Sequence, residues 1–226
     1  MDDVQQQRDV LIIFDIDGTL TNTVPLHKKA FSAAIAALGI TDFDDDYGGY
    51  LHHTDSYIFN TIFAKHIGLP VTAEIMQTFE NYLTAHFALA TVSNPIAEIE
   101  GAAQAIAWLQ QNKNYAVAFA TGSLTGPAVL KLTQAGISFL PELLVTANEL
   151  QTRDEIVLTA CRNAAAYYGQ LPFRRTISVG DGMWDMKTAI ANGLEFVGIG
   201  TTRFADAAGV GLIINDFTGT AFFDYL

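Results

Sequence analysis

The sequence has one cysteine, Cys161, and only 12 lysine and arginine residues against 24 aspartate and glutamate residues. A single cysteine excludes an internal disulfide and a cysteine-rich metal site. The formal net charge of −12 opposes binding to nucleic acid or to an anionic membrane. We therefore expect neither as a partner, and an anionic substrate would need a locally positive site.

Long hydrophobic runs and long polar tracts are also absent. The chain begins with a polar segment, and the apolar run Val10–Phe14 is too short for a signal peptide or a membrane-spanning helix. Half of the residues are hydrophobic and 16% are charged, which is typical of a globular chain. These features predict a folded, cytoplasmic protein.

Short apolar segments of strand length recur along the chain, each bounded by polar or glycine-rich turns. We predict strands at Val10–Phe14, Ala116–Ala120, Leu143–Val145, Thr176–Val179, Phe196–Ile199 and Leu212–Ile214. Amphipathic helices are predicted between most of them, at Ala102–Asn112, Pro127–Ala135, Arg153–Tyr168 and Trp184–Asn192. This alternation predicts an α/β fold with a Rossmann-like, doubly wound parallel sheet.

The connection between the first and second predicted strands is much longer than a crossover helix requires. It contains three segments with helical apolar spacing, Pro25–Leu38, Asp55–His66 and Ala73–Ala88. We therefore predict two parts. Residues 1–20 and 94–226 form the core, and residues 21–93 form a small helical cap inserted after the first strand.

Two aspartates, Asp15 and Asp17, directly follow the first predicted strand in the sequence FDIDGTL. Ligand sites of open α/β sheets lie beyond the carboxyl ends of the strands, where these carboxylates fall. One such carboxylate can attack phosphorus while the other exchanges a proton with the leaving oxygen. The alternative is a turn in which aspartate and glycine merely supply loop geometry.

This segment resembles the first motif, DxDx[TV], of the haloacid dehalogenase-like superfamily. The second motif, a threonine or serine that ends a strand, is matched by ATGS at residues 120–123. The fourth motif, GDxxxD, is matched by GDGMWD at residues 180–185. The resemblance extends over the whole chain, and among its subgroups the capped phosphoglycolate phosphatase and β-phosphoglucomutase-like proteins are similar.

The resemblance implies a Mg2+ site. In it Asp15 and Asp181 would supply carboxylate ligands, Asp17 a backbone carbonyl, and Asp185 a hydrogen bond to the inner ligands. A dianionic phosphate beside carboxylates would be repelled unless a cation lay between them. Oxygen ligands of this kind favour Mg2+.

Phosphate binding is predicted at the second and third motifs. Thr121 and the backbone N–H groups around Gly122 and Ser123 can donate to phosphate oxygens at a strand end. The third motif of the family usually has a lysine, and here that position is Arg153, which becomes the predicted phosphate-binding cation. Lys131 is the competing cation, but we expect it on the surface because it lies well inside a helix.

Three residues of the predicted cap are specificity candidates. Thr23 and His27 lie near the spacing at which capped members of the family often place substrate contacts and a histidine. His53 lies where related caps often carry a specificity loop.

Together these features predict a Mg2+-dependent phosphatase that acts on a small phosphorylated metabolite through an aspartyl-phosphate on Asp15. A phosphomutase acting on a sugar phosphate is the alternative, favoured by His27 and disfavoured by Asn22. Dehalogenation is less expected, because such relatives lack the second aspartate of the first motif. Phosphonate cleavage would need a Schiff-base lysine from the cap. The fold alone also permits a non-catalytic binding module, although every acidic motif position is present.

Overall fold

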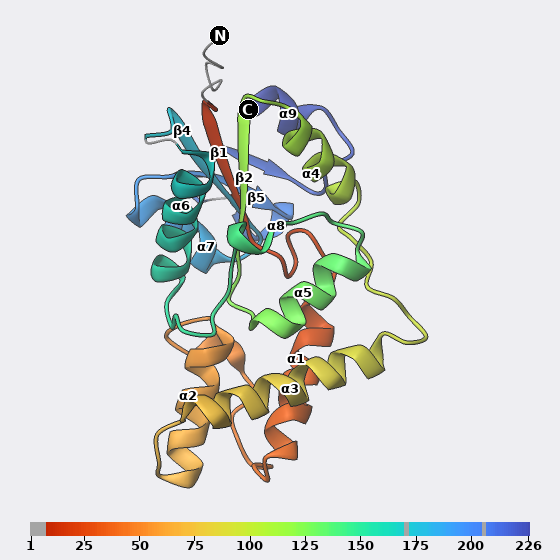
Figure 1. Ribbon diagram of the computed structural model, residues 1–226, viewed down its shortest axis with the longest axis vertical. Coiled ribbons are helices and arrows are strands. Elements are labelled where there is room, and N and C mark those ends of the chain that lie inside the picture. Colours follow the sequence, from red (N-terminus) through yellow and green to blue (C-terminus); the bar gives the residue numbers. More distant parts are fainter. Residues whose placement is uncertain (1–7, 170–171, 205–206) are drawn as a thin grey trace.

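The computed structural model describes residues 8–169, 172–204 and 207–226. They contain a parallel sheet with the strand order β3-β2-β1-β4-β5-β6 (Figure 1). Its strands are β1 Val10–Phe14, β2 Tyr115–Ala120, β3 Leu144–Val145, β4 Arg175–Gly180, β5 Glu195–Ile199 and β6 Leu212–Ile214. The predicted α/β fold is confirmed, and the predicted strands agree with these bounds to within one residue.

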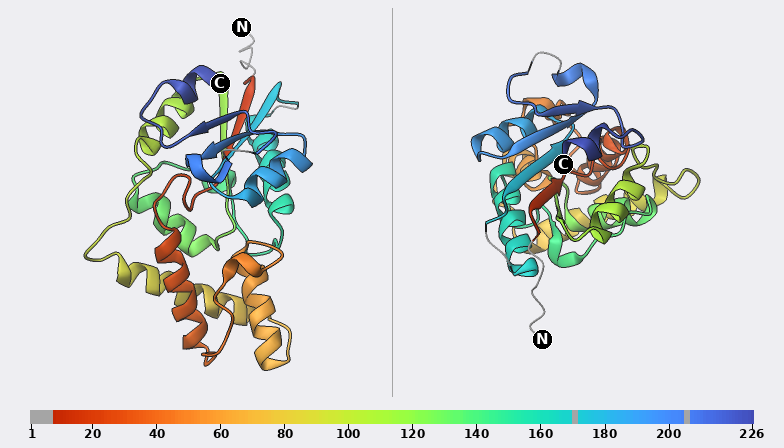
Figure 2. Two further views of the ribbon diagram at one scale, coloured as in Figure 1. Left: turned by 180° about the vertical axis from the view of Figure 1, so that it is seen from behind. Right: turned by 90° about the horizontal axis from the view of Figure 1, so that it is seen from above.

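The central strand β1 is buried on both faces. Its even-numbered residues pack with α4 (Ala102–Gln111) and α9 (Ala221–Tyr225), whereas Leu11 and Ile13 pack with α6 (Arg153–Tyr168). Alternate residues of a strand point to opposite faces, so an unbroken apolar run fits a strand that helices cover on both sides. The right-hand view of Figure 2 shows α4 and α6 on opposite sides of the sheet.

Three helices lie between β1 and β2, and we call them the inserted helices: α1 (Val24–Ala37), α2 (Asp55–Ile67) and α3 (Ala73–Ala90). The 3-10 helix η1 (Tyr47–Gly49) lies between α1 and α2. The three predicted helical segments agree with these bounds to within two residues. The inserted helices lie together at the end of the molecule opposite the C-terminus (Figure 1).

A cluster of phenylalanines forms the core of the inserted helices. Phe59 stacks on Phe79 with ring centroids 4.0 Å apart, and Phe31 meets Phe79 edge to face at 5.0 Å. Leu124, which directly precedes α5 (Thr125–Gln134), is buried in the same cluster. The inserted helices are therefore docked on α5. This helix belongs to the sheet-containing part, by which we mean the six strands and the helices other than the inserted ones.

The remaining elements of the sheet-containing part are short. The 3-10 helix η2 (Pro141–Leu143) precedes β3, α7 (Met183–Ala191) follows β4, and α8 (Thr201–Phe204) follows β5. Within the described ranges, no helix is both long and apolar enough to cross a membrane.

Candidate active site

The site lies at the carboxyl edge of the sheet, where the strand order reverses. Strands run outward from β1 in one direction and from β4 in the other, and this divergence opens a crevice in doubly wound sheets. Asp15 directly follows β1 and Asp181 directly follows β4, and the two strands are paired with Phe14 opposite Val179. Strand pairing thus brings together two acidic motifs that are far apart in the sequence.

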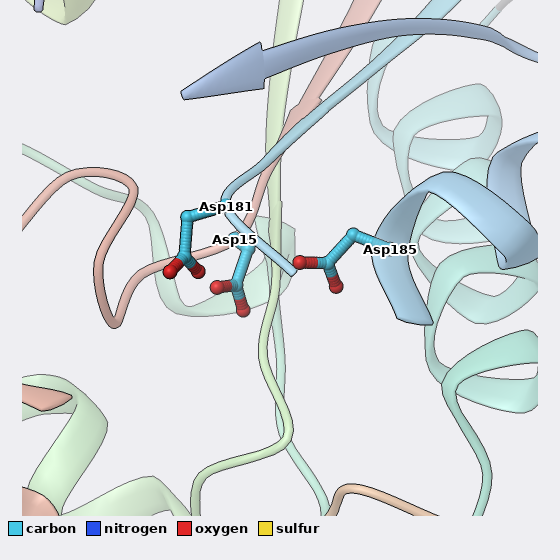
Figure 3. Close-up of side chains that lie close together, drawn as sticks. All are labelled: Asp15, Asp181 and Asp185. Carbon is cyan, nitrogen blue, oxygen red and sulfur yellow. The ribbon is translucent and has the colours of Figure 1, made fainter. Parts of the chain in front are cut away.

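Asp15, Asp181 and Asp185 form a cluster of buried carboxylates (Figure 3). One oxygen of each lies within 4.8 Å of those of the other two. Asp185 is in the first turn of α7, where its Oδ2 accepts a hydrogen bond from the Gly182 N–H at 3.0 Å. Gly18 packs against the cluster with a φ of 79°, and a Cβ there would overlap the Asp181 carboxylate. Only glycine fits this position of the first motif.

Burial raises the pKa values of these carboxyl groups. The pKa of Asp181 is raised to about 6, because burial and the charge of Asp15 favour the protonated form and Arg203 offsets them only in part. Burial likewise raises the pKa values of Asp15 and Asp185. Three buried carboxylates this close together repel one another, and their oxygens are the donors that a hard divalent cation binds. The cluster therefore fits a Mg2+ ion.

Arg153 extends from the start of α6 into the acidic cluster. A capping box at residues 152–155 fixes where this helix begins. The Arg153 Nη1 donates to Asp15 Oδ1 at 3.0 Å and lies 3.5 Å from Asp185 Oδ1. Its Nε donates to the backbone carbonyl of His53 at 3.0 Å. The structure thus brings Arg153 to the edge where the phosphate-binding cation was predicted.

Lys131 corrects a sequence prediction, because it is fully buried instead of lying on the surface. The inserted helices cover the face of α5 that carries it, which the sequence of α5 alone does not reveal. Its Nζ lies 2.6 Å from Asp17 Oδ2, 2.8 Å from His27 Nδ1 and 3.0 Å from Ser123 Oγ. Burial alone would raise the pKa of Asp17, but the charge of Lys131 and the hydrogen bonds from Lys131 and Thr23 outweigh it and lower that pKa to about 2.

Thr23 is also placed differently from the prediction. Its side chain is fully buried, and its hydroxyl donates to Asp17 Oδ1 at 2.5 Å. The same hydroxyl lies 2.7 Å from that of Thr21. Thr23 is absent from the cavity lining, so in this structure its side chain supports Asp17.

A cavity of about 130 Å³ lies between the sheet edge and the inserted helices. The predicted residues His27, His53, Gly122 and Ser123 line it, whereas Thr121 is buried behind them and its Oγ1 accepts the Ser123 N–H at 3.1 Å. Other lining residues include Asp15, Asp17, Val24, Phe31, Ile58, Arg153 and Trp184.

The ring of His53 stacks on that of Trp184 with centroids 4.2 Å apart. Burial, followed by the nearby charges of Arg153 and Lys187, lowers the pKa of His53. This neutral, stacked histidine therefore forms a contact between the segment before α2 and α7.

The family model of haloacid dehalogenase-like hydrolases matches residues 10–193. This chain belongs to that family. The resemblance seen in the motifs is therefore confirmed, and the chain is a hydrolase of the haloacid dehalogenase-like type. No curated protein matches its sequence.

Solved structures share the fold of this hydrolase over nearly its whole length. CbbY from Rhodobacter sphaeroides in complex with phosphate is 20% identical, with a TM-score of 0.65 over 95% of this chain and 97% of that chain. A CbbY variant in complex with xylulose-(1,5)bisphosphate gives 20% identity and a TM-score of 0.68 over the same shares. A family IA hydrolase from Entamoeba histolytica gives 16% identity and a TM-score of 0.67 over 97% and 99%. At these identities the likeness concerns the fold alone.

Two residues of this haloacid dehalogenase-like hydrolase were not predicted as part of the site. Asp55, at the start of α2, lies with its Oδ1 2.7 Å from His27 Nε2. Its position after Thr54 resembles an ordinary helix start, so the sequence carried no distinct signal. Arg203 in α8 donates to the Asp181 carboxylate and to the Asp181 backbone carbonyl. Only the fold brings α8 back to the acidic cluster.

Proposed function

We propose that this hydrolase cleaves the phosphate monoester of a small phosphorylated metabolite, with Asp15 as the nucleophile and Mg2+ as the cofactor. The observation that carries the proposal is the convergence of three buried carboxylates and Arg153, of which Asp15 and Arg153 line the cavity. A cavity of about 130 Å³ is small beside the roughly 300–1,000 Å³ of sites for drug-sized ligands. It therefore favours a small substrate and not a nucleic acid.

The reaction would proceed in two steps. Asp15 attacks phosphorus, the ester P–O bond breaks, and the leaving alkoxide takes a proton from Asp17. Water then attacks the phosphorus of the aspartyl-phosphate and gives a proton to Asp17, which releases inorganic phosphate and restores Asp15. The low pKa of Asp17 keeps it ionised in the substrate-free site. A nearby phosphate dianion raises that pKa, which favours uptake of the proton that the leaving group needs.

Four aspartates would serve the metal. Asp15 and Asp181 would bind it through carboxylate oxygens and Asp17 through its backbone carbonyl, while Asp185 would hold the inner ligands by a hydrogen bond. When bound, Mg2+ offsets the negative charge of the carboxylates and of the transferring phosphoryl group. The Asp17 carboxylate is hydrogen-bonded to Lys131 and Thr23 and would not bind the metal. It therefore remains available for proton transfer.

Positive groups on the sheet side would bind the phosphoryl oxygens. Arg153 supplies a planar guanidinium that can contact two oxygens, and Gly122 and Ser123 line the cavity beside it. The Thr121 hydroxyl accepts the Ser123 N–H and would donate its own proton to a phosphoryl oxygen.

We further propose that residues 21–93 form a cap over a core of residues 1–20 and 94–226, of which residues 1–7 lie outside the described ranges. A cap that closes over the site excludes water and large substrates. His27 and His53 line the cavity from this side, so they are placed to select the substrate.

A phosphate-release assay tests the proposal. We expect wild-type protein to release phosphate from some members of a panel of sugar phosphates, phosphoglycolate, nucleotides and an aryl phosphate. This release should stop in chelator and return with Mg2+. Asp15→Asn should be inactive while its circular dichroism stays unchanged. A phosphomutase would isomerise a sugar phosphate with little release, and a binding module would do neither. Wild-type rates in Asp15→Asn would refute the nucleophile.

A further inference from the structure

The side chain of Lys131 lies in the interior of the protein with no exposed surface. Moving an ammonium group out of water costs several kcal/mol unless hydrogen bonds and opposite charge compensate for it. Here the compensation is complete, because the three ammonium protons meet three acceptors on Asp17, His27 and Ser123. The group also lies 4.9 Å from the ring centroid of Phe87.

The contact with Lys131 assigns the tautomer of His27. A lysine ammonium only donates hydrogen bonds, so His27 Nδ1 must accept and Nε2 must carry the proton. Nε2 then donates to Asp55 Oδ1 at 2.7 Å. The order of the chain is therefore Asp17, Lys131, His27 and Asp55, with donor and acceptor defined at each link.

Asp55 joins this chain of hydrogen bonds to the backbone of the sheet-containing part. Its Oδ2 accepts the Leu124 N–H at 3.0 Å, and its own N–H donates to the Gly122 carbonyl at 2.7 Å. His27 lies on α1 and Asp55 on α2, whereas Lys131 lies on α5. The chain of hydrogen bonds is thus complete only while the inserted helices are docked on α5.

We propose that Lys131 is a positioning residue for Asp17, and that His27 and Asp55 make this positioning depend on the docked inserted helices. The proposal rests on the proposed function, in which Asp17 transfers the proton. Both carboxylate oxygens of Asp17 are held, Oδ1 by Thr23 at 2.5 Å and Oδ2 by Lys131 at 2.6 Å. With both oxygens held, the carboxylate has one orientation, as a proton-transfer group beside a leaving oxygen requires.

The two cations Arg153 and Lys131 therefore have different partners. Arg153 contacts Asp15 and Asp185, while Lys131 contacts Asp17. Loss of Arg153 should weaken phosphate binding and attack with every substrate. Loss of Lys131 should instead affect the step that needs Asp17, which is most demanding when the leaving group is a poorly acidic alkoxide.

A double-mutant cycle of Lys131→Met and Asp17→Asn tests the proposal. Methionine has a similar length and packs well beside an aromatic ring such as that of Phe87. For an alkyl phosphate we expect Lys131→Met to lower kcat on the order of 10- to 100-fold, with KM changed less than about 3-fold and a smaller loss for an aryl phosphate. In the Asp17→Asn background the same change should cause no further loss, because the group that Lys131 positions is already disabled.

Independent losses in the two backgrounds, or equal losses with alkyl and aryl substrates, would overturn the proposal. Lys113→Met removes one exposed positive charge in the turn between α4 and β2, and it should leave kcat within about 2-fold. If Lys131→Met does not fold, Asp55→Asn replaces it in the cycle. Asp55 is linked to Asp17 through His27 and Lys131, so the smaller loss in Asp55→Asn should also vanish in the Asp17→Asn background.

A crystal structure of Lys131→Met gives a result that does not depend on activity. We expect the Asp17 carboxylate to rotate away from its present orientation, and an unchanged carboxylate would overturn the positioning role. If wild-type protein hydrolyses no phosphate ester, the proposed function fails, and this structure still decides whether Lys131 orients Asp17.

Discussion

The metal-free protein should become more stable, relative to an Asp181→Asn variant, as the pH falls from 8 to 5. The pKa of Asp181 is raised from 3.8 to about 6 in the folded protein, mainly by burial. That difference corresponds to about 3 kcal/mol of destabilisation when the carboxyl is ionised. The folded protein binds the proton more tightly than the unfolded chain, so stability is gained as the pH falls through about 6.

At pH 5, one pH unit below the folded pKa, about 1.4 kcal/mol of that destabilisation should be relieved. For a chain of this size it corresponds to a melting temperature about 3–6 °C higher. The assay is thermal unfolding of chelator-treated wild-type protein and Asp181→Asn at both pH values. The comparison cancels the opposing contribution of His53, whose lowered pKa removes stability as the pH falls.

In saturating Mg2+ the wild-type protein should melt at a higher temperature at pH 8, because the cation stabilises the ionised carboxylates. Its melting temperature should then change much less between pH 8 and pH 5. Asp181→Asn should respond much less to Mg2+. If wild-type protein and Asp181→Asn differed in melting temperature by the same amount at pH 8 and at pH 5, the Asp181 carboxyl would not be the titrating group. The reasoning would then be wrong.

Three further predictions concern activity. Arg153→Ala should lose at least roughly 2–3 kcal/mol of transition-state stabilisation, as for one preorganised donor, whereas Arg153→Lys should keep part of the rate. Both effects are measured as kcat/KM. A nearly unchanged kcat/KM in Arg153→Ala would contradict the assignment of Arg153 as the phosphate-binding cation. Asp17→Asn should slow alkyl phosphates more than aryl phosphates, and equal slowing in rate assays would remove its acid role. His53→Ala should reorder a substrate panel more than it slows a small aryl phosphate, and a uniform loss across the panel would assign His53 to structure.

Much of the fold could be predicted because its signals are local. Each strand is a short apolar run between turns, and the capping box at residues 152–155 marks the start of α6 at Arg153. The acidic motifs directly follow strands, and parallel strands present their carboxyl ends at one edge. The sequence alone therefore determined the sheet, the inserted helices and the edge at which Asp15 and Asp181 meet.

The surroundings of Asp17 were decided only by the tertiary structure. Lys131 lies in the buried stripe of α5 beside Ala128 and Leu132, but a lysine in a helix is usually exposed, because burial of its charge is costly without partners. Those partners come from the loop after β1, from α1 and from the loop after β2, and no spacing within one segment relates them. For the same reason the sequence did not reveal that Thr23 holds Asp17. Local patterns determine which elements form, whereas the docking of the inserted helices on α5 determines which polar side chains meet in the interior.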